Sequence, residues 1–103
     1  MKTTIEVKTE LYSWIAAALG LSEKSTGILN NTLAKGTTLQ VFLTDLAKQY
    51  PVFAEKVFNP VTFRITPRVL VMVNKKMVRG VDLARTVLHQ GNVILLMPII
   101  FGG

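Results

Sequence analysis

The chain has 103 residues, of which half are apolar, with a net charge of +6 and no cysteine. This length predicts a single domain, 1–103, and the missing cysteines exclude disulfides, thiolate metal sites and a thiolate nucleophile. A single histidine, His89, argues against a metal centre or a Ser-His-Asp arrangement, so we expect no metal site. We expect a cytoplasmic protein, because residues 1–8 carry charge and no apolar run is long enough to span a bilayer.

The charge is uneven along the chain. Residues 1–55 hold equal numbers of basic and acidic side chains, whereas residues 56–103 hold seven basic ones against Asp82 alone. Such a field favours an acidic or phosphate-bearing partner. Aromatic side chains do not alternate with the basic ones as a stacking platform would require, which argues against nucleic acid. The mean hydropathy of +0.40 predicts an exposed apolar patch for a protein partner.

The first third of the chain predicts a hairpin around a short helix. Residues 3–11 alternate loosely between apolar and polar, which is typical of a strand with one exposed face. Residues 12–20 predict a helix with Ser13 as N-cap and Gly20 as its end. Residues 26–33 predict a second, weaker strand that pairs with the first.

The clearest helix follows at residues 39–50. Its apolar residues recur at helical spacing, which predicts one buried stripe formed by Leu39, Phe42, Leu43, Leu46, Ala47 and Tyr50. Thr37 and Gln40 fit a capping box at the start, and Pro51 discourages continuation. We expect this stripe to cover one face of a sheet.

The second half predicts a packed connection and three further strands. Residues 51–67 read as an irregular connection with one helical turn, packed through Phe53, Val57 and Phe58. Residues 69–73 are all apolar, which predicts a strand buried on both faces. A turn leads into a short return strand at residues 77–78.

The region before the last strand predicts a brief helical or extended stretch and a turn. Core candidates there are Leu83, Val87 and Leu88, and residues 90–92 turn the chain into the final apolar run. The element order therefore predicts an α+β fold of the β-grasp (ubiquitin-like) arrangement. We expect a mixed sheet of four or five strands with one main helix across it.

The chain ends with nine apolar residues and two glycines. Residues 93–97 predict a strand, and residues 98–103 predict a flexible, extended C-terminal tail, because Pro98 favours extended backbone. Gly102 and Gly103 lack side chains, so the tip can enter a narrow channel. Six extended residues reach roughly 20 Å, enough to enter a partner's active site.

Three stretches carry a family resemblance. Residues 46–58 (LAKQYPVFAEKVF), residues 68–74 (RVLVMVN) and the terminal Gly102-Gly103, in this order and spacing, resemble the small subunit of molybdopterin synthase. More broadly, the chain is similar to the ubiquitin-like sulfur carriers along nearly its whole length. The resemblance implies a β-grasp fold and a terminal Gly103 that carries sulfur as a thiocarboxylate.

The chemistry of such a carrier depends on partners. An α-carboxylate is an anion at neutral pH and a poor electrophile, so it must be activated. In relatives an E1-like adenylyltransferase uses ATP to adenylate the terminal glycine, and a large catalytic subunit then receives the sulfur. The resemblance thus implies a carrier with no catalytic residues of its own and no bound cofactor. Because the chain has no cysteine, Gly103 is the expected attachment point.

The resemblance also places a docking surface on the sheet face beside the tail. We expect partner contacts from the end of the chain, namely Leu95, Met97, Pro98, Ile99, Ile100 and Phe101. Val69 and Val71 are further candidates. Two features depart from the family pattern: Lys75-Lys76 follows Asn74 where glycine is common, and bulky Phe101 precedes the glycines. The second leaves the identity of the partner open.

Three alternatives remain at this point. The chain could be a ubiquitin-like modifier that forms isopeptide bonds through Gly103, or a sulfur carrier for thiamine or tRNA thiolation. The long segment 51–67 favours the molybdopterin branch over the shorter thiamine carriers. It could also be a binding domain whose tail has no chemical role.

Overall fold

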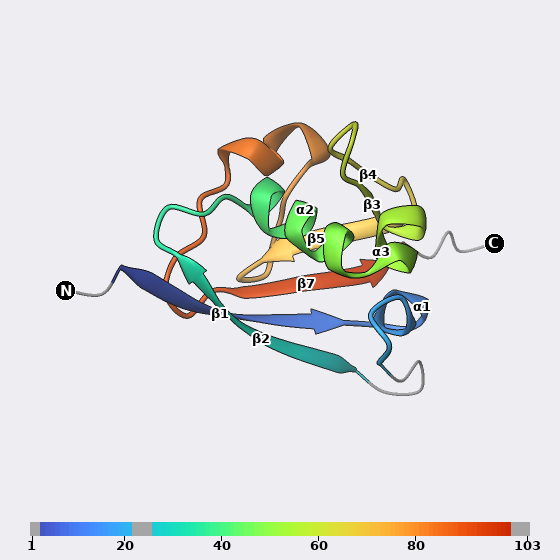
Figure 1. The fold of residues 1–103 in the computed structure, drawn as a ribbon, viewed down its shortest axis with the longest axis horizontal. Helices are drawn as coiled ribbons and strands as arrows, with labels where there is room; N and C mark the ends of the chain where they lie inside the picture. Colours follow the sequence, from blue (N-terminus) through green and yellow to red (C-terminus); the bar gives the residue numbers. More distant parts are fainter. Residues whose placement is uncertain (1–2, 22–25, 100–103) are drawn as a thin grey trace.

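The computed structural model describes residues 3–21 and 26–99, and it confirms the expected α+β class (Figure 1). A five-stranded mixed sheet has the order β2-β1-β7-β5-β6, and a two-stranded sheet has the order β3-β4. The strands are β1 (Thr4–Leu11), β2 (Gly27–Ala34), β3 (Phe58–Asn59), β4 (Arg64–Ile65), β5 (Val69–Val73), β6 (Lys76–Met77) and β7 (Val93–Pro98). The helices are α1 (Trp14–Ala17), α2 (Leu39–Gln49), α3 (Pro51–Lys56) and the 3-10 helix η1 (Gly80–Arg85). None of the described helices has the length and hydropathy of a membrane span.

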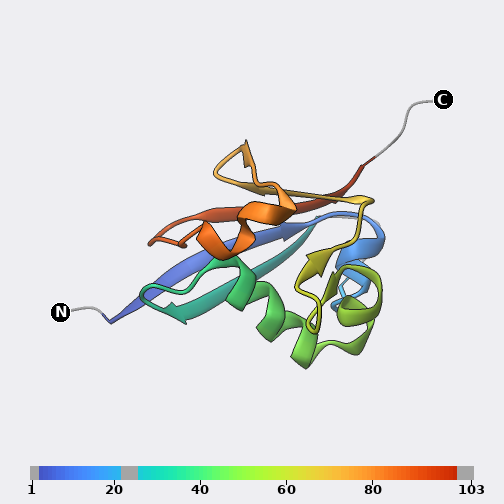
Figure 2. The same ribbon diagram turned by 90° about the horizontal axis from the view of Figure 1, so that it is seen from above.

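The terminal strand β7 lies in the middle of the large sheet. It runs parallel to β1 and antiparallel to β5, so the last strand of the chain is hydrogen-bonded on both sides. Figures 1 and 2 show α2 and α3 on one face of this sheet, while no helix of the described residues covers the other face. We call these the helix-covered face and the open face.

The core forms between the sheet and α2. Alternate strand residues point to the helix-covered face, and the predicted stripe of α2 meets them. Fully buried there are Leu11, Leu39, Leu43, Ile94 and Leu96, each at 0% exposure. Burial of each such side chain stabilises the folded chain by about 1.5–3 kcal/mol. The buried side chains of Ile94 and Leu96 therefore fix which face of β7 points to α2.

The N-cap of α2 is not the residue that the sequence predicted. The N-cap of α2 is Thr38, whose Oγ1 accepts a hydrogen bond from Val41 N at 3.2 Å. The predicted capping box of Thr37 and Gln40 is therefore wrong by one residue, because the Thr37 hydroxyl donates instead to Ala34 O at 2.6 Å. Adjacent threonines offer the same chemistry, and only the backbone conformation decides between them.

Around α1 the predicted start and end are both found. Ser13 lies at the N-cap position, without a side-chain capping hydrogen bond. Gly20 has φ 76°, and Leu21 N donates to Ala16 O at 3.0 Å. This left-handed glycine with a hydrogen bond back into the last turn is a Schellman end, as the sequence indicated.

The segment 51–67 is more ordered than predicted. Pro51 starts α3, where its missing N–H costs nothing, and Phe53, Val57 and Phe58 are fully buried as expected. The following hairpin of β3 and β4 pairs Phe58 with Ile65. Strands of two residues are too short to show an alternating pattern, so the sequence did not indicate them.

One predicted core residue is wrong. Leu83 and Leu88 are buried, but Val87 is 42% exposed. Leu39 N donates to Thr86 O and Leu88 N donates to Thr37 O, so this short stretch is extended and paired with the start of α2. In extended backbone neighbouring side chains point in opposite directions, and Val87 therefore faces outward.

Candidate functional site

The predicted site residues fall into two groups. Outside the described residues lie the last four, Ile100, Phe101, Gly102 and Gly103. Their predicted roles therefore stay predictions. Within the described part lie Leu95, Met97, Pro98 and Ile99, at the end of β7 and just beyond it.

Leu95 and Met97 lie on the open face. Their neighbours Ile94 and Leu96 are fully buried on the helix-covered face, and side chains alternate along a strand. Leu95 and Met97 are accordingly only partly buried. Their orientation leaves both side chains accessible to another protein.

Neighbouring strands extend these two residues into an apolar strip. Met97 pairs with Leu70 and Leu95 pairs with Met72 across the β5–β7 ladder. Met72 also pairs with Met77 of β6, which is 67% exposed. Paired residues share a face, so these five side chains form one strip, called here the apolar strip. An exposed apolar group of this kind on a small domain indicates a protein partner.

Val69 and Val71, the further candidates for partner contacts, do not lie on the open face. They are 5% and 2% exposed and point to the helix-covered face, so they are core residues. On β5 it is Leu70 and Met72 that are only partly buried and lie on the open face, and sequence reasoning missed them as candidates. A run of five apolar residues predicts burial on both faces, and β5 is buried on one. The available signal was the excess of apolar residues in the whole chain.

A shallow hollow of about 540 Å³ borders the strip. It is lined by Lys8, Glu10, Tyr12, Met72, Asn74, Lys75, Val93 and Leu95. Glu10 lies beside Leu95 in the β1–β7 ladder, while the two lysines lie at the margin. An apolar centre with a charged margin is the composition of protein–protein interfaces.

The end of β7 is anchored on both sides. Tyr12 N donates to Leu96 O at 3.1 Å, and Ile99 N donates to Arg68 O at 2.8 Å. Pro98 has no N–H to donate. Successive N–H groups along an extended chain point to opposite sides, and the N–H of the next residue, Ile99, makes the hydrogen bond on the β5 side. The tail that the sequence predicted from residue 98 therefore begins with Pro98, the last residue of β7, and Ile99, whose N–H is hydrogen-bonded to Arg68 O.

The described residues contain no cluster of three or more potential metal ligands. His89 lies in the turn before β7, where its backbone N–H donates a hydrogen bond to Asn92 Oδ1 at 2.8 Å. What the described geometry provides is a partly exposed apolar surface on the strand that leads toward the last residues of the sequence.

Comparisons with known proteins agree with this geometry. The ThiS family profile matches residues 23–103, and no curated protein sequence matches the chain significantly. The solution structure of the Haloferax volcanii HVO 2177 protein superposes with a TM-score of 0.76 at 20% identity, covering 100% of this chain and 91% of that one.

Two further solved structures are similar. Small archaeal modifier protein 1 from Methanosarcina acetivorans has a TM-score of 0.72 at 19% identity, covering 99% of this chain and 100% of that one. A putative molybdopterin converting factor, subunit 1, from Pyrococcus furiosus has a TM-score of 0.69 at 18% identity, covering 93% and 99%. At these identities the likeness shows the fold, and it confirms the β-grasp prediction.

The profile match covers most of the chain, well over half of its residues. Its fold and the position of its terminal strand fit the same group. The chain belongs to the ThiS family, and it has a β-grasp fold.

Proposed function

We propose that this chain is a sulfur carrier activated at Gly103, and that it serves as the small subunit of molybdopterin synthase in molybdenum- or tungsten-cofactor biosynthesis. One observation carries the proposal: the apolar strip includes Leu95 and Met97 of the strand that leads directly to the C-terminus. A partner that docks on the strip thereby receives the end of the chain at a fixed position. The likeness to the putative molybdopterin converting factor, subunit 1, from Pyrococcus furiosus supports the molybdopterin assignment.

The activation step follows from carboxylate chemistry. A carboxylate oxygen of Gly103 attacks the α-phosphorus of ATP, a new O–P bond forms, and pyrophosphate leaves. A hydrosulfide equivalent from a sulfur donor then attacks the acyl carbon, a C–S bond forms, and AMP leaves. Both steps take place in an E1-like adenylyltransferase that binds the ATP. The chain itself is the acyl group and supplies no catalytic residue, bound cofactor or metal ligand.

Docking limits how far the terminus reaches. Because Ile99 is still bonded to Arg68, only four residues follow the anchored part of the chain. Four extended residues span about 14 Å, less than the reach predicted from residue 98. The partner's reaction centre must therefore lie close to the rim of the docking surface. Phe101 would accompany the glycines into that channel.

The positive charge of the chain indicates which charge a partner's surface should carry around its apolar centre. Lys8 and Lys75 border the strip, and the chain carries +6 overall. We propose that the activating enzyme and the large synthase subunit each present an apolar surface bordered by acidic side chains. A cytoplasmic location follows from this role.

A second candidate is a protein modifier. The likeness to small archaeal modifier protein 1 favours it, since the same acyl-adenylate can react with a lysine amine to form an isopeptide bond. The same thiocarboxylate could also supply thiamine or tRNA thiolation. These routes share the activated Gly103 and differ in the acceptor.

Deletion of Gly102 and Gly103 tests the shared step. The truncated chain keeps every residue of the described core, so we expect it to fold as the full one does. We expect it to lose molybdenum-cofactor synthesis in its host, and the full-length chain should co-purify with a large synthase subunit. Survival of cofactor synthesis, of tRNA and thiamine thiolation and of lysine conjugation together would contradict every tail-based function. Loss of tRNA thiolation alone would point to the other branch.

A further inference from the structure

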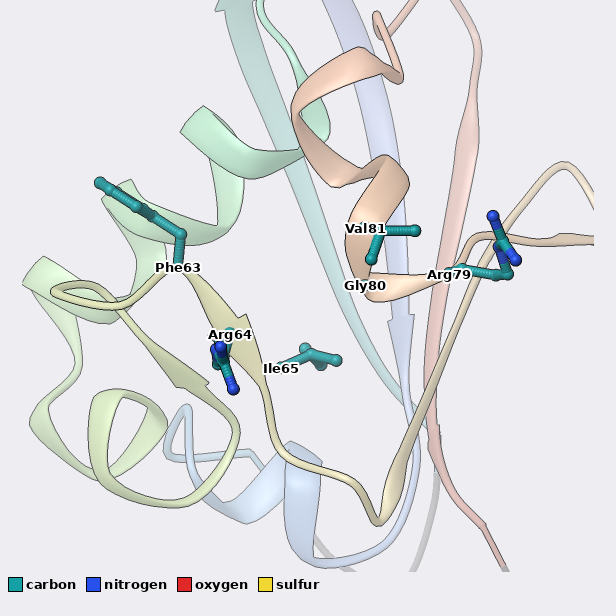
Figure 3. A pocket seen from close by; sticks show the side chains of 6 residues that line it. All are labelled: Phe63, Arg64, Ile65, Arg79, Gly80 and Val81. Atoms are coloured by element: carbon teal, nitrogen blue, oxygen red, sulfur yellow. The ribbon is translucent and has the colours of Figure 1, made fainter.

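A second surface lies away from the open face, between the β3–β4 hairpin and η1. A groove of about 570 Å³ is lined there by Phe63, Arg64, Ile65, Arg79, Gly80 and Val81 (Figure 3). None of these residues belongs to the apolar strip or to the hollow beside it. The groove therefore leaves the open face free for another partner.

The groove has an apolar floor and two different rims. Figure 3 shows Ile65 between β4 and the segment at Gly80, with Phe63 and Arg64 on one side and Arg79 and Val81 on the other. Ile65 is partly buried and packs against the core, so the floor is fixed. Val81 is 73% exposed and Phe63 is 46% exposed. Figure 3 shows the Phe63 ring pointing away from Ile65, so Ile65 and Val81 form the apolar part of the groove.

Hydrogen bonds within the β3–β4 hairpin fix the backbone conformation that leads to Phe63. Asn59 Oδ1 accepts hydrogen bonds from Val61 N at 2.8 Å and Thr62 N at 3.1 Å, and Phe63 N donates to Asn59 O at 2.8 Å. Phe63 has φ 57°, a left-handed conformation that a bulky residue rarely adopts. Such strain is typical of functional sites, and here it keeps an aromatic ring at the surface.

The charges of the groove are basic. Arg79 Nε donates to Asp82 Oδ2 at 3.3 Å, and the arginine side chain is 75% exposed, so the rest of its guanidinium group remains accessible. Arg64 is exposed and makes no ion pair within the described part of the chain, although Glu55 borders a neighbouring hollow. An arginine fork binds carboxylates in a bidentate manner.

We propose that this groove binds an acidic segment of a partner protein in extended form. An apolar side chain of the segment packs on Ile65 beside Val81, and flanking carboxylates pair with Arg64 and Arg79. A second copy of this chain fits the groove poorly, because both copies carry +6. The apolar floor at Ile65 favours an apolar side chain between the two arginines, which a peptide supplies and a phosphate backbone does not.

An NMR titration with a short peptide that alternates glutamate and leucine tests the proposal. We expect amide shifts confined to residues 63–65 and 79–81, and binding that weakens at least tenfold, by about 1.4 kcal/mol, in Arg64→Glu. Lys35→Glu makes the same change of net charge in the turn after β2 and should leave the affinity within about twofold.

A groove-filling variant provides an independent test. A Cβ atom at Gly80 would lie 3.7 Å from Ile65 Cγ2 without a clash, so the longer side chain of Gly80→Leu extends across the floor. We expect this variant to keep its fold, as judged by its amide spectrum, and to lose the peptide.

Several results would overturn the proposal. They are shifts on the apolar strip instead of the groove, equal binding by Arg64→Glu and Lys35→Glu, and equal binding of a peptide with glutamine in place of glutamate. Tighter binding of a single-stranded oligonucleotide at the groove, or no shift at up to about 1 mM peptide, would also overturn it.

Discussion

The two faces of β5 and β7 are built from the same kinds of residue and serve different ends. On the helix-covered face Ile94 and Leu96 are fully buried beneath the helices, whereas on the open face Leu95 and Met97 remain partly exposed. All four are large and apolar, so composition alone does not separate them. The difference is set by which face α2 covers. In this chain both faces of these two strands are apolar, and the fold itself buries only one of them.

This difference separates stability from binding. A side chain on the helix-covered face has contacts within the chain, and its loss should be felt as unfolding. In the proposed function a side chain on the open face contacts another protein, and its loss should be felt as weaker association. Substitutions of adjacent residues on one strand can therefore be assigned to one effect or the other.

The largest expected effect is on the helix-covered face. Leu96→Ala removes a fully buried side chain and should lower the free energy of unfolding by about 2–5 kcal/mol. Urea denaturation followed by circular dichroism measures it. Leu95→Ala, one residue earlier, should cost less than about 1 kcal/mol. Equal losses in both variants would mean that the two faces are not different in the way described.

On the open face we expect a binding effect of intermediate size. Met97→Asp places a charge in the apolar strip and should weaken binding to the activating enzyme by about 10–100-fold, with stability nearly unchanged. Isothermal titration calorimetry with the enzyme from the same host measures it. Val41→Asp, an exposed apolar position on α2, is the matched control and should bind as the wild type does. Loss of binding in the control as well would remove the open face from the interface.

A smaller change in stability is expected at Thr9 on the helix-covered face. Thr9 is 0% exposed there, and its hydroxyl has no hydrogen-bond partner within the described residues. Thr9→Val keeps the shape and should raise the free energy of unfolding by about 1 kcal/mol, because an unpaired buried polar group is costly. Thr44→Val is the comparison, since the Thr44 hydroxyl donates to Gln40 O at 2.7 Å. A gain in Thr44→Val equal to that in Thr9→Val would argue against this explanation.

The smallest effect concerns the turn at the margin of the open face. Asn74 and Lys75 form the two-residue turn between β5 and β6, with φ values of 49° and 70°. Lys75→Gly relieves the left-handed conformation and should stabilise the fold by about 0.5 kcal/mol, a Tm rise of about 2–4 °C. Lys76→Gly, within β6, should lower Tm instead. Scanning calorimetry that shows the opposite order would contradict the turn assignment.

Sequence reasoning succeeded where periodicity was long and failed where a choice was local. The stripe of α2 and the strand character of β5 and β7 follow from apolar spacing over many residues. The side of β5 that is covered does not, because a run of valine, leucine and methionine shows no alternation. Leu70 and Met72 were missed for this reason, and Val69 and Val71 were chosen in their place.

The candidate site shows the same limit. The apolar excess predicted a patch, and the terminal strand was expected to carry it, but its partners on β5 and β6 depend on strand order in space. The groove at Phe63 and Arg64 arises from a hairpin of two-residue strands that has no sequence signature. The Gly102-Gly103 end was evident from the sequence, and its chemistry lies beyond the described residues.

Intact-mass spectrometry of the chain purified from its own host tests the central claim most directly. A sulfur carrier should show a fraction whose mass exceeds the unmodified chain by the replacement of one oxygen by one sulfur, with the change located at Gly103. Met97→Asp should reduce this fraction, because the activating enzyme can no longer dock, while Val41→Asp should retain it. A chain found only unmodified, or only as conjugates linked to lysines of other proteins, would contradict the proposed role as a sulfur carrier.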